Sequence, residues 1–249
     1  MKQKDVFYAV DSPELAEASE KAQSTFKYFW RELWWDNRRM IPALDFSCVK
    51  VAFSQNDSSG KPEVEFMWIN EVEFDGVYIE GILINQPEKL TNVKEGDSVK
   101  ITLEELKDWI YSVEGKAYGG YTVHVLRSNM GKIKRMIHDK AWGLDFGDSK
   151  NILVAFDQEK HPENLIDHPM NVNMEDSLKN YLTQNPGEVT KKDEFGYTML
   201  HREAIAGNRG CVEVILEMGA DKDAKTNSGF TAYDFAKKMG WDHLVEVLK

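Results

Sequence analysis

The sequence predicts an α+β protein, with an N-terminal helix packed on a mostly antiparallel β-sheet domain and followed by a short all-α stack of repeats. Three observations predict this class. Apolar residues recur at helical spacing over residues 12–35, strand-like segments follow between residues 47 and 127, and a 33-residue period runs through the end of the chain. Strands grouped after a flanking helix are typical of an α+β architecture. We expect a domain over residues 1–160, a linker over 161–173 and the stack over 174–249.

The helix over residues 12–35 has clear start signals. Ser12 suits the N-cap, and Pro13 has the backbone geometry of the first helical position. Apolar residues form one face at spacings of three and four: Leu15, Ala18, Ala22, Phe26, Phe29 and Leu33. Three tryptophans widen this face: Trp30, Trp34 and Trp35. We expect them to fill the core between the helix and a sheet, with a ligand pocket as the alternative.

Alternating apolar and polar residues predict the strands that follow. "SCVKVAFS" at 47–54 is one strand, "NDSSGKP" is a turn, and "EVEFMWINEVEFDG" is a second strand ending in a hairpin signal. "VYIEGILIN" at 77–85 pairs with it across the hairpin, and "VKEGDSVKIT" supplies another turn and strand. Residues 103–112 predict a short helix or an ordered segment, and residues 118–127 predict a further strand.

Bulk composition narrows the functional classes. Apolar residues make up 42% of the chain, which supports a packed core. The formal net charge of −11 disfavours nucleic acid and membrane as partners, because both select basic surfaces, and leaves a basic protein partner open. Cys48 and Cys211 are expected to be two buried thiols, with a single disulfide between them as the alternative. The N-terminal stretch lacks the apolar run of a signal peptide, so we expect a cytoplasmic location.

A shift of 33 residues places Gly196 on Gly229, Thr198 on Thr231, and Gly207 on Gly240. The segments "GYTMLH" at 196–201, "AGN" at 206–208 and "LEMGAD" at 216–221 resemble the ankyrin repeat. The threonines suit helix N-caps, and the glycines suit left-handed positions at helix ends. The stack is then predicted as a half repeat over 174–192 and repeats over 193–225 and 226–249.

The resemblance to ankyrin repeats implies a protein partner that contacts the turns and inner helices. The positions that vary in that family correspond here to Glu194, Phe195, Tyr197, Lys225, Asn227 and Phe230. An immunity-type inhibitor of a basic toxin is one concrete form of this hypothesis.

Arg202 and Glu203 occupy positions where ankyrin repeats have apolar residues. Unpaired burial of these charges would cost several kcal/mol each. We therefore predict that they dock the stack on the first domain, together with Leu178 and Leu182 of the half repeat. The alternative is that Arg202 extends to water past a loosely packed edge.

Five blocks in the first domain resemble the YegJ-like family of bacterial domains of unknown function. They are "KVAF", "EFMWINEV", "GILINQP", "KEGDSVKI" and "LKDWIY", within residues 15–155. The resemblance implies no activity.

Few residues predict chemistry, and we expect no enzymatic activity, no cofactor and no metal. "YGGY" at 118–121 is placed before a strand, so it predicts a turn and not a phosphate cradle. A nucleophile pairing Cys48 with His124 or His138 remains open. Asp108 is expected to cap a helix, and Trp109 to be a core ring. One alternative to a protein-binding adaptor is a small-molecule site or enzyme near Trp68, Trp109 or the Trp34–Trp35 pair. The other is a purely stabilising role for the repeats.

Overall fold

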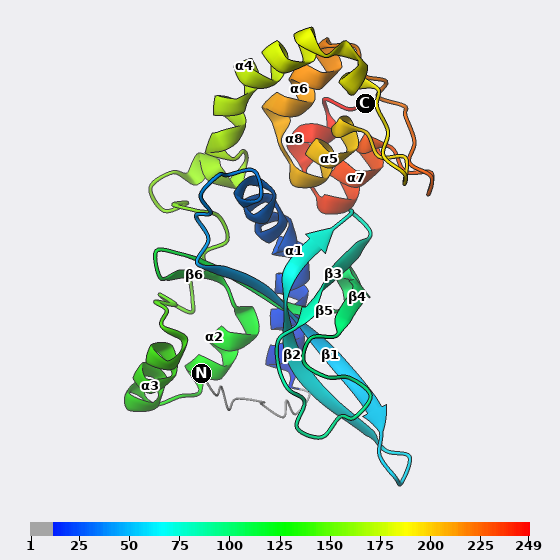
Figure 1. Cartoon of the computed structure of the whole chain (residues 1–249). Helices are drawn as coiled ribbons and strands as arrows, with labels where there is room; N and C mark the ends of the chain where they lie inside the picture. The colour runs from blue at the N-terminus through cyan, green and yellow to red at the C-terminus, as the bar shows by residue number, and fades with distance from the viewer. Residues whose placement is uncertain (1–11) are drawn as a thin grey trace. The chain divides into compact units, whose positions relative to one another are not determined.

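The computed structural model describes residues 12–249 (Figure 1). Residues 1–11, which carry most of the stretch used to exclude a signal peptide, lie outside this range. The described chain forms two compact units. Unit 1 contains residues 12–29 and Arg39–Val154, and unit 2 contains Trp30–Arg38 and Ala155–Lys249. The N-terminal helix, the antiparallel sheet and the later helices confirm the predicted α+β class.

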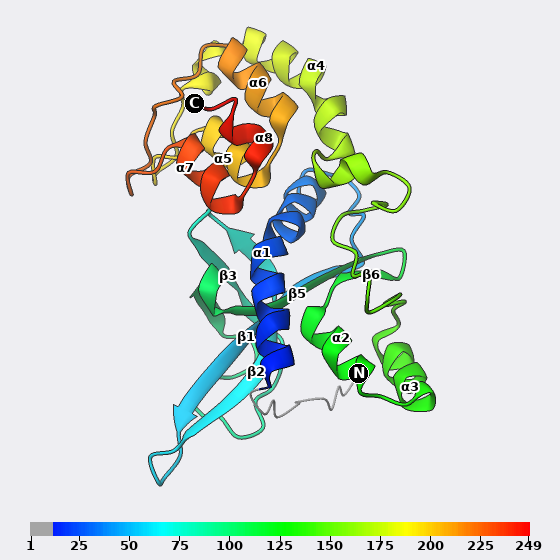
Figure 2. The same ribbon diagram turned by 180° about the vertical axis from the view of Figure 1, so that it is seen from behind.

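Helix α1 (Pro13–Asp36) begins where the sequence predicts. The hydroxyl of Ser12 accepts a hydrogen bond from the backbone N–H of Leu15 at 3.3 Å. In unit 1 the helix buries Phe26 and Phe29 completely, and Phe29 packs against Trp109 with 5.8 Å between ring centroids. Figure 2 shows this part of the helix lying across one face of the sheet.

The sheet has six strands in the order β4-β3-β2-β1-β5-β6, and every neighbouring pair is antiparallel. The strands are β1 (Phe46–Asn56), β2 (Pro62–Phe74), β3 (Tyr78–Leu83), β4 (Ser98–Thr102), β5 (Leu106–Val113) and β6 (Lys116–Gly119). Successive side chains point to opposite faces. Val49 and Trp109 therefore face α1, whereas Cys48 and Ile110 belong to a second cluster with Val123 and Phe146.

The predicted strand over 118–127 is wrong. The strand β6 stops at Gly119, and a helix, α2 (Tyr121–Ser128), follows. Gly119 and Gly120 have φ values of 74° and 71°, a left-handed conformation that turns the chain away from the sheet. The carboxylate of Asp108 accepts hydrogen bonds from the backbone N–H groups of Tyr121 and Thr122 at 2.9 and 2.8 Å. These bonds satisfy two of the free donors of the helix N-terminus.

Residues 103–112 form a short 3-10 turn, Leu103–Glu105, followed by β5. The C-terminal part of unit 1 also contains α3 (Lys132–Trp142). Its two bounding glycines are Gly131 at the N-cap and Gly143, whose φ of 70° ends the helix in a left-handed position.

The part of unit 2 that follows Val154 starts with a 3-10 turn, Pro162–Leu165, and continues with five helices and a second 3-10 turn, Pro186–Val189. The helices are α4 (Pro169–Gln184), α5 (Met199–Ala206), α6 (Arg209–Glu217), α7 (Ala232–Met239) and α8 (Asp242–Val245). The pair α5–α6 and the pair α7–α8 repeat one local geometry. Thr198 and Thr231 cap the first helix of each pair, and Gly207 and Gly240 end it at φ values of 81° and 67°.

The helix α4 packs against α6, which in turn packs against α8, while α5 packs against α7. The helix α4 therefore holds the position of the outer helix of one further unit. Leu182 on α4 is completely buried there, and Leu178 is half-buried. Cys48 and Cys211 are both buried and not bridged. No helix among residues 12–249 has the length and apolar character needed to span a membrane.

Candidate functional site

The first turn of the helical stack is organised by Asp193. Its backbone N–H donates to the carbonyl of Tyr197 at 3.0 Å, and its carboxylate accepts from the N–H groups of Phe195 and Tyr197, both at 2.9 Å. Gly196 completes the turn with a φ of 82°. The side chain of Phe195, carried on this turn, is 60% exposed.

The second turn repeats the first at an offset of 33 residues. The backbone N–H of Thr226 donates to the carbonyl of Phe230 at 2.9 Å, and the hydroxyl of Thr226 accepts from the N–H of Phe230 at 3.2 Å. Gly229, with a φ of 86°, matches Gly196. The residue equivalent to Phe195 is Ser228, so only the first turn presents a large exposed ring.

Three hydrogen bonds join the two turns. The backbone N–H of Asn227 donates to the carbonyl of Phe195 at 2.9 Å, and its side-chain amide donates to the carbonyl of Glu194 at 2.9 Å. The ammonium of Lys192 donates to the carbonyl of Lys225 at 3.0 Å. The two turns therefore form one ordered surface. Binding to such a surface avoids the conformational-entropy cost of ordering two separate loops.

Four of the six predicted partner-binding residues are exposed on these turns: Glu194, Phe195, Lys225 and Asn227. We call these four residues the tip surface. Phe230 is half-buried because its ring packs on Phe235 at 5.4 Å. The structure corrects the prediction that Tyr197 contacts a partner directly, because the side chain of Tyr197 is only 7% exposed.

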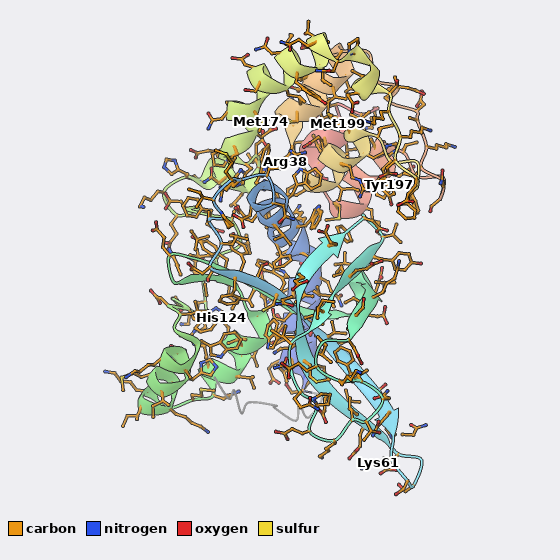
Figure 3. The ribbon with its side chains drawn as sticks, in the orientation of Figure 1. Arg38, Lys61, His124, Met174, Tyr197 and Met199 are labelled. Carbon is orange, nitrogen blue, oxygen red and sulfur yellow. The ribbon has the colours of Figure 1, made fainter. Side chains whose placement is uncertain are left out.

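Tyr197 is buried from two sides. Its ring stacks on Phe235 at 5.6 Å, and the guanidinium of Arg202 covers it at 4.1 Å (Figure 3 labels Tyr197). Arg202 also forms an ion pair with Asp193 at 2.7 Å. Although partial burial raises the pKa of Asp193, hydrogen bonds from Arg202 and from the backbone N–H groups of the turn lower it below its ordinary value. Arg202 thus supports the turn that carries Phe195, and its predicted docking role remains a prediction.

Glu203 is buried at 2% exposure and fully partnered. Its carboxylate forms an ion pair with Arg38 and accepts hydrogen bonds from the side-chain amide of Asn208 at 2.6 Å and from the indole of Trp34 at 3.4 Å. These contacts offset the cost of removing a carboxylate from water. Arg38 and Trp34 lie far earlier in the chain, yet belong to the same compact unit as Glu203 (Figure 3 labels Arg38).

The segment Trp30–Arg38 forms part of the core of unit 2. The indole of Trp35 is completely buried, donates to the side-chain carbonyl of Asn208 at 2.9 Å and stacks on His168 at 5.6 Å. Glu32 and His168 pair at 3.2 Å inside the same unit. The prediction that Trp34 and Trp35 fill the space between the helix and the sheet is therefore wrong, because their polar atoms find partners on the helical stack.

Arg31 of the same segment makes further polar contacts within unit 2. The guanidinium of Arg31 is completely buried, donates to the carbonyls of Asn164 and Ile166, and lies 5.2 Å from the ring of Trp241. Sequence reasoning missed that this stretch belongs to unit 2. The signal was present in the unusual charge at Glu203, a buried carboxylate that required partners of opposite or polar character.

A second polar cluster lies in unit 1, around the N-terminus of α2. The hydroxyl of Thr122 donates to Asp108 at 2.5 Å and accepts from the ammonium of Lys50 at 2.8 Å. Burial raises the pKa of Asp108, although Lys50 and Thr122 oppose this change. Burial lowers the pKa of Lys50, whose ammonium lies 4.6 Å from the ring centroid of Trp68.

The helix α2 also changes the interpretation of "YGGY" at 118–121. A helix N-terminus does follow these residues, contrary to the prediction. Two of its first backbone donors, those of Tyr121 and Thr122, are already bound to the carboxylate of Asp108, which lies where an anion would bind. Asp108 is thus a helix cap, as expected. Trp109 is completely buried and donates to the carbonyl of Ala22 at 2.9 Å, as expected of a core ring.

The proposed partners of Cys48 have other contacts. His124 lies 3.1 Å from a guanidinium nitrogen of Arg127, and His138 lies 2.9 Å from the carboxylate of Asp139. Burial and the nearby charge of Asp108 raise the pKa of the Cys48 thiol, which disfavours the reactive thiolate. Within residues 12–249, no three His, Cys, Asp or Glu side chains gather in a group that could hold a metal ion.

Comparisons with known proteins identify a bacterial family and two relatives of this chain. The model of the family described as "Uncharacterized protein conserved in bacteria (DUF2314)" matches residues 12–146. A protein of Neisseria meningitidis serogroup B, named "Putative ankyrin repeat protein", is 45% identical over 245 residues, which cover 98% of this chain and 96% of that protein. The protein of Escherichia coli strain K12 named "Uncharacterized protein YegJ" is 37% identical over 62 residues, 25% of this chain and 40% of that protein.

Proposed function

The chain belongs to the family of uncharacterized proteins conserved in bacteria (DUF2314), and from this premise we propose that it is a non-catalytic protein that binds a protein partner through the tip surface of its helical stack. The two helix pairs of unit 2 are proposed to be ankyrin repeats, a type of repeat that the name of the Neisseria relative also states for that protein. The full-length similarity to that relative supports a shared architecture.

The exposure of Phe195 is the observation that carries this proposal. A large ring that is 60% exposed on a hydrogen-bonded turn offers apolar area to a partner with little loss of conformational freedom. Glu194, Lys225 and Asn227 surround it with charged and polar groups. An aromatic anchor within a polar rim is the usual composition of a protein-binding surface.

The net charge supports a more specific partner. A chain with a net charge of −11 attracts a basic protein before the two surfaces touch, and this attraction speeds their association. We therefore propose a basic partner, with inhibition of a basic toxin as the concrete case. The non-catalytic assignment is supported by Cys48, whose thiol pKa is raised, and by Asp108, whose oxygens cap α2.

The test compares Phe195→Ser with Val172→Ser. Val172 is a matched control, because it is an exposed apolar residue of the same unit, at 63% exposure on α4. A partner is first captured by cross-linking in the native bacterium at low salt, then purified and titrated against each variant by calorimetry. Loss of an anchor ring typically costs about 2 kcal/mol or more, so the Phe195 variant should bind about 30-fold more weakly. Equal affinities for the two variants, or no recoverable partner, would contradict the proposal.

A second candidate is a small-molecule site or enzyme in unit 1, favoured by Lys50. Its amino group has a lowered pKa and lies beside the face of Trp68, so a larger fraction is neutral and nucleophilic than for an exposed lysine. Incubation with a small aldehyde, borohydride reduction and peptide mapping tests this candidate. Faster labelling of Lys50 than of the exposed Lys89 would favour it, and equal or slower labelling would remove it.

A further inference from the structure

The inner side of helix α3 is firmly attached to α2. The guanidinium of Arg127 on α2 binds both carboxylate oxygens of Asp139 on α3, each at 2.8 Å. His138 pairs with the same carboxylate at 2.9 Å, and the ring of Trp142 packs on Phe146 at 5.9 Å. Bidentate pairs of this kind define orientation as well as distance. The orientation of α3 relative to α2 is therefore set, and so is the side that it leaves outward.

The outward side of α3 is apolar. Ile133, Met136 and Ile137 are 72%, 63% and 61% exposed. Their spacing of three and four residues places them on one face of the helix. The helix has no buried residue, and it lies beyond α2 on the side away from α1 (Figures 1 and 2). Three adjacent large apolar side chains in water are unfavourable and indicate a contact that covers them.

Basic residues surround this apolar face. Lys132, Lys134 and Lys140 are exposed on α3, whose single acid, Asp139, is paired with Arg127. The helix is thus locally cationic in a chain whose net charge is −11. At physiological salt, exposed charges are screened beyond about 8 Å. A surface that meets α3 therefore experiences mainly these lysines, and the net charge of the chain does not exclude an anionic surface there.

We propose that the outer face of α3 is a docking surface for an anionic lipid bilayer. Ile133, Met136 and Ile137 insert at the boundary between headgroups and acyl chains, and the three lysines contact the lipid phosphates. A helix with an apolar face and a basic rim is typical of proteins that lie on a membrane without crossing it. The high exposure of the three apolar side chains favours a deformable lipid surface, which needs no matching groove. This inference is independent of the tip surface.

The test is flotation of the full-length protein with vesicles of phosphatidylcholine alone and of phosphatidylcholine with phosphatidylglycerol in equal parts. We expect at least about tenfold stronger partitioning to the anionic vesicles, lost at high salt, because each lysine near such a surface adds favourable interaction. The variant Ile133→Ser/Met136→Ser/Ile137→Ser should partition at least about tenfold more weakly. Circular dichroism establishes that each variant is folded.

Two further variants keep the test decisive. Lys132→Gln/Lys134→Gln/Lys140→Gln changes only exposed charges and should also abolish the preference for anionic vesicles. Val172→Ser/Tyr181→Ser removes exposed apolar residues of α4 and should bind like the unmodified chain. Equal partitioning of the unmodified protein to both vesicle types would overturn the proposal. So would a dimer in sedimentation velocity that the Ile133/Met136/Ile137 variant loses, without vesicle binding, because α3 would then contact a second copy of the chain.

Discussion

Glu203 of α5 and Arg38, which follows α1, form an ion pair between positions 165 residues apart. The carboxylate is 2% exposed, whereas the guanidinium is 31% exposed. The pair shows how a buried carboxylate is accommodated inside unit 2. Arg38, Trp34 and Asn208 provide the partners that a buried carboxylate needs.

Replacement of Glu203 by Ala should destabilise unit 2 by about 1–3 kcal/mol, because Arg38 and Asn208 lose their acceptor in a largely dry environment. The partial exposure of Arg38 keeps the expected cost below that of a fully buried pair. Urea unfolding measures the change. Glu213→Ala is the control, since its ion pair with Arg209 is close to half exposed on both sides and should contribute about 0–1 kcal/mol. Equal losses for the two variants would contradict the assigned role of Glu203.

Gly196 and Gly229 offer a matched pair for testing the tip surface. Both have a left-handed backbone, with φ values of 82° and 86°. A Cβ at Gly196 would lie 2.7 Å from the Asn227 side-chain oxygen and 2.8 Å from its backbone nitrogen, whereas a Cβ at Gly229 meets no atom within 4 Å. Gly229→Ala should cost about 1 kcal/mol for the backbone conformation.

Gly196→Ala should cost more than Gly229→Ala by at least about 1 kcal/mol, because the two turns must also separate. Thermal unfolding measures both variants, and amide exchange at Asn227 reports whether its hydrogen bond to Phe195 survives. If both variants lose the same stability and retain protection at Asn227, the close approach of the turns plays no energetic role.

Stability should depend on pH through His124. Burial, and then the charge of Arg127, lowers the pKa of His124 from its ordinary value of 6.5 to about 4. The unfolded chain therefore binds a proton between these pH values that the folded chain does not. Stability rises with pH wherever the unfolded state holds more protons. The contribution of this histidine is complete above about pH 6.5 and is lost as pH falls toward 4.

Unfolding of His124→Gln should therefore show a flatter pH dependence between pH 4 and 6.5 than unfolding of the unmodified chain. Asp139 opposes the effect of Arg127 on His124, and it is held by that same arginine. Urea denaturation at several pH values measures the difference. An unchanged slope in the variant would show that other groups control acid stability in this range.

A fragment of residues 155–249 should not fold alone. It lacks Trp30–Arg38, which supply Trp35 and Arg31 to the core of unit 2. Without them the carboxylate of Glu203 keeps only Asn208, and the side-chain carbonyl of Asn208 loses the indole donor of Trp35. Circular dichroism and urea titration should show no cooperative transition. Linking residues 12–38 to this fragment through a flexible glycine-serine segment should restore one, and a cooperative transition without them would contradict the prediction.

Local patterns in the sequence determined much of the secondary structure of this protein. The apolar spacing of residues 12–35 is sufficient to specify a helix, and Ser12 and Pro13 specify its start. The 33-residue period predicted two helix pairs with threonine caps and glycine ends, because capping and left-handed turns depend on residues within a few positions. The exposure of Phe195 at a turn was also predicted from the repeat pattern.

Tertiary structure decided what depends on distant partners. Residues 121–128 have the composition of a strand, yet they form a helix because Asp108 of β5 binds its first backbone donors. Trp34 and Trp35 belong to unit 2 because Glu203 and Asn208, more than 160 residues later, bind their indoles. Tyr197 is covered by Arg202 and Phe235, so that its side chain is largely buried. The periodicity of a sequence predicts which face of a helix or strand is apolar. It does not predict which distant polar group will contact that face in the folded chain.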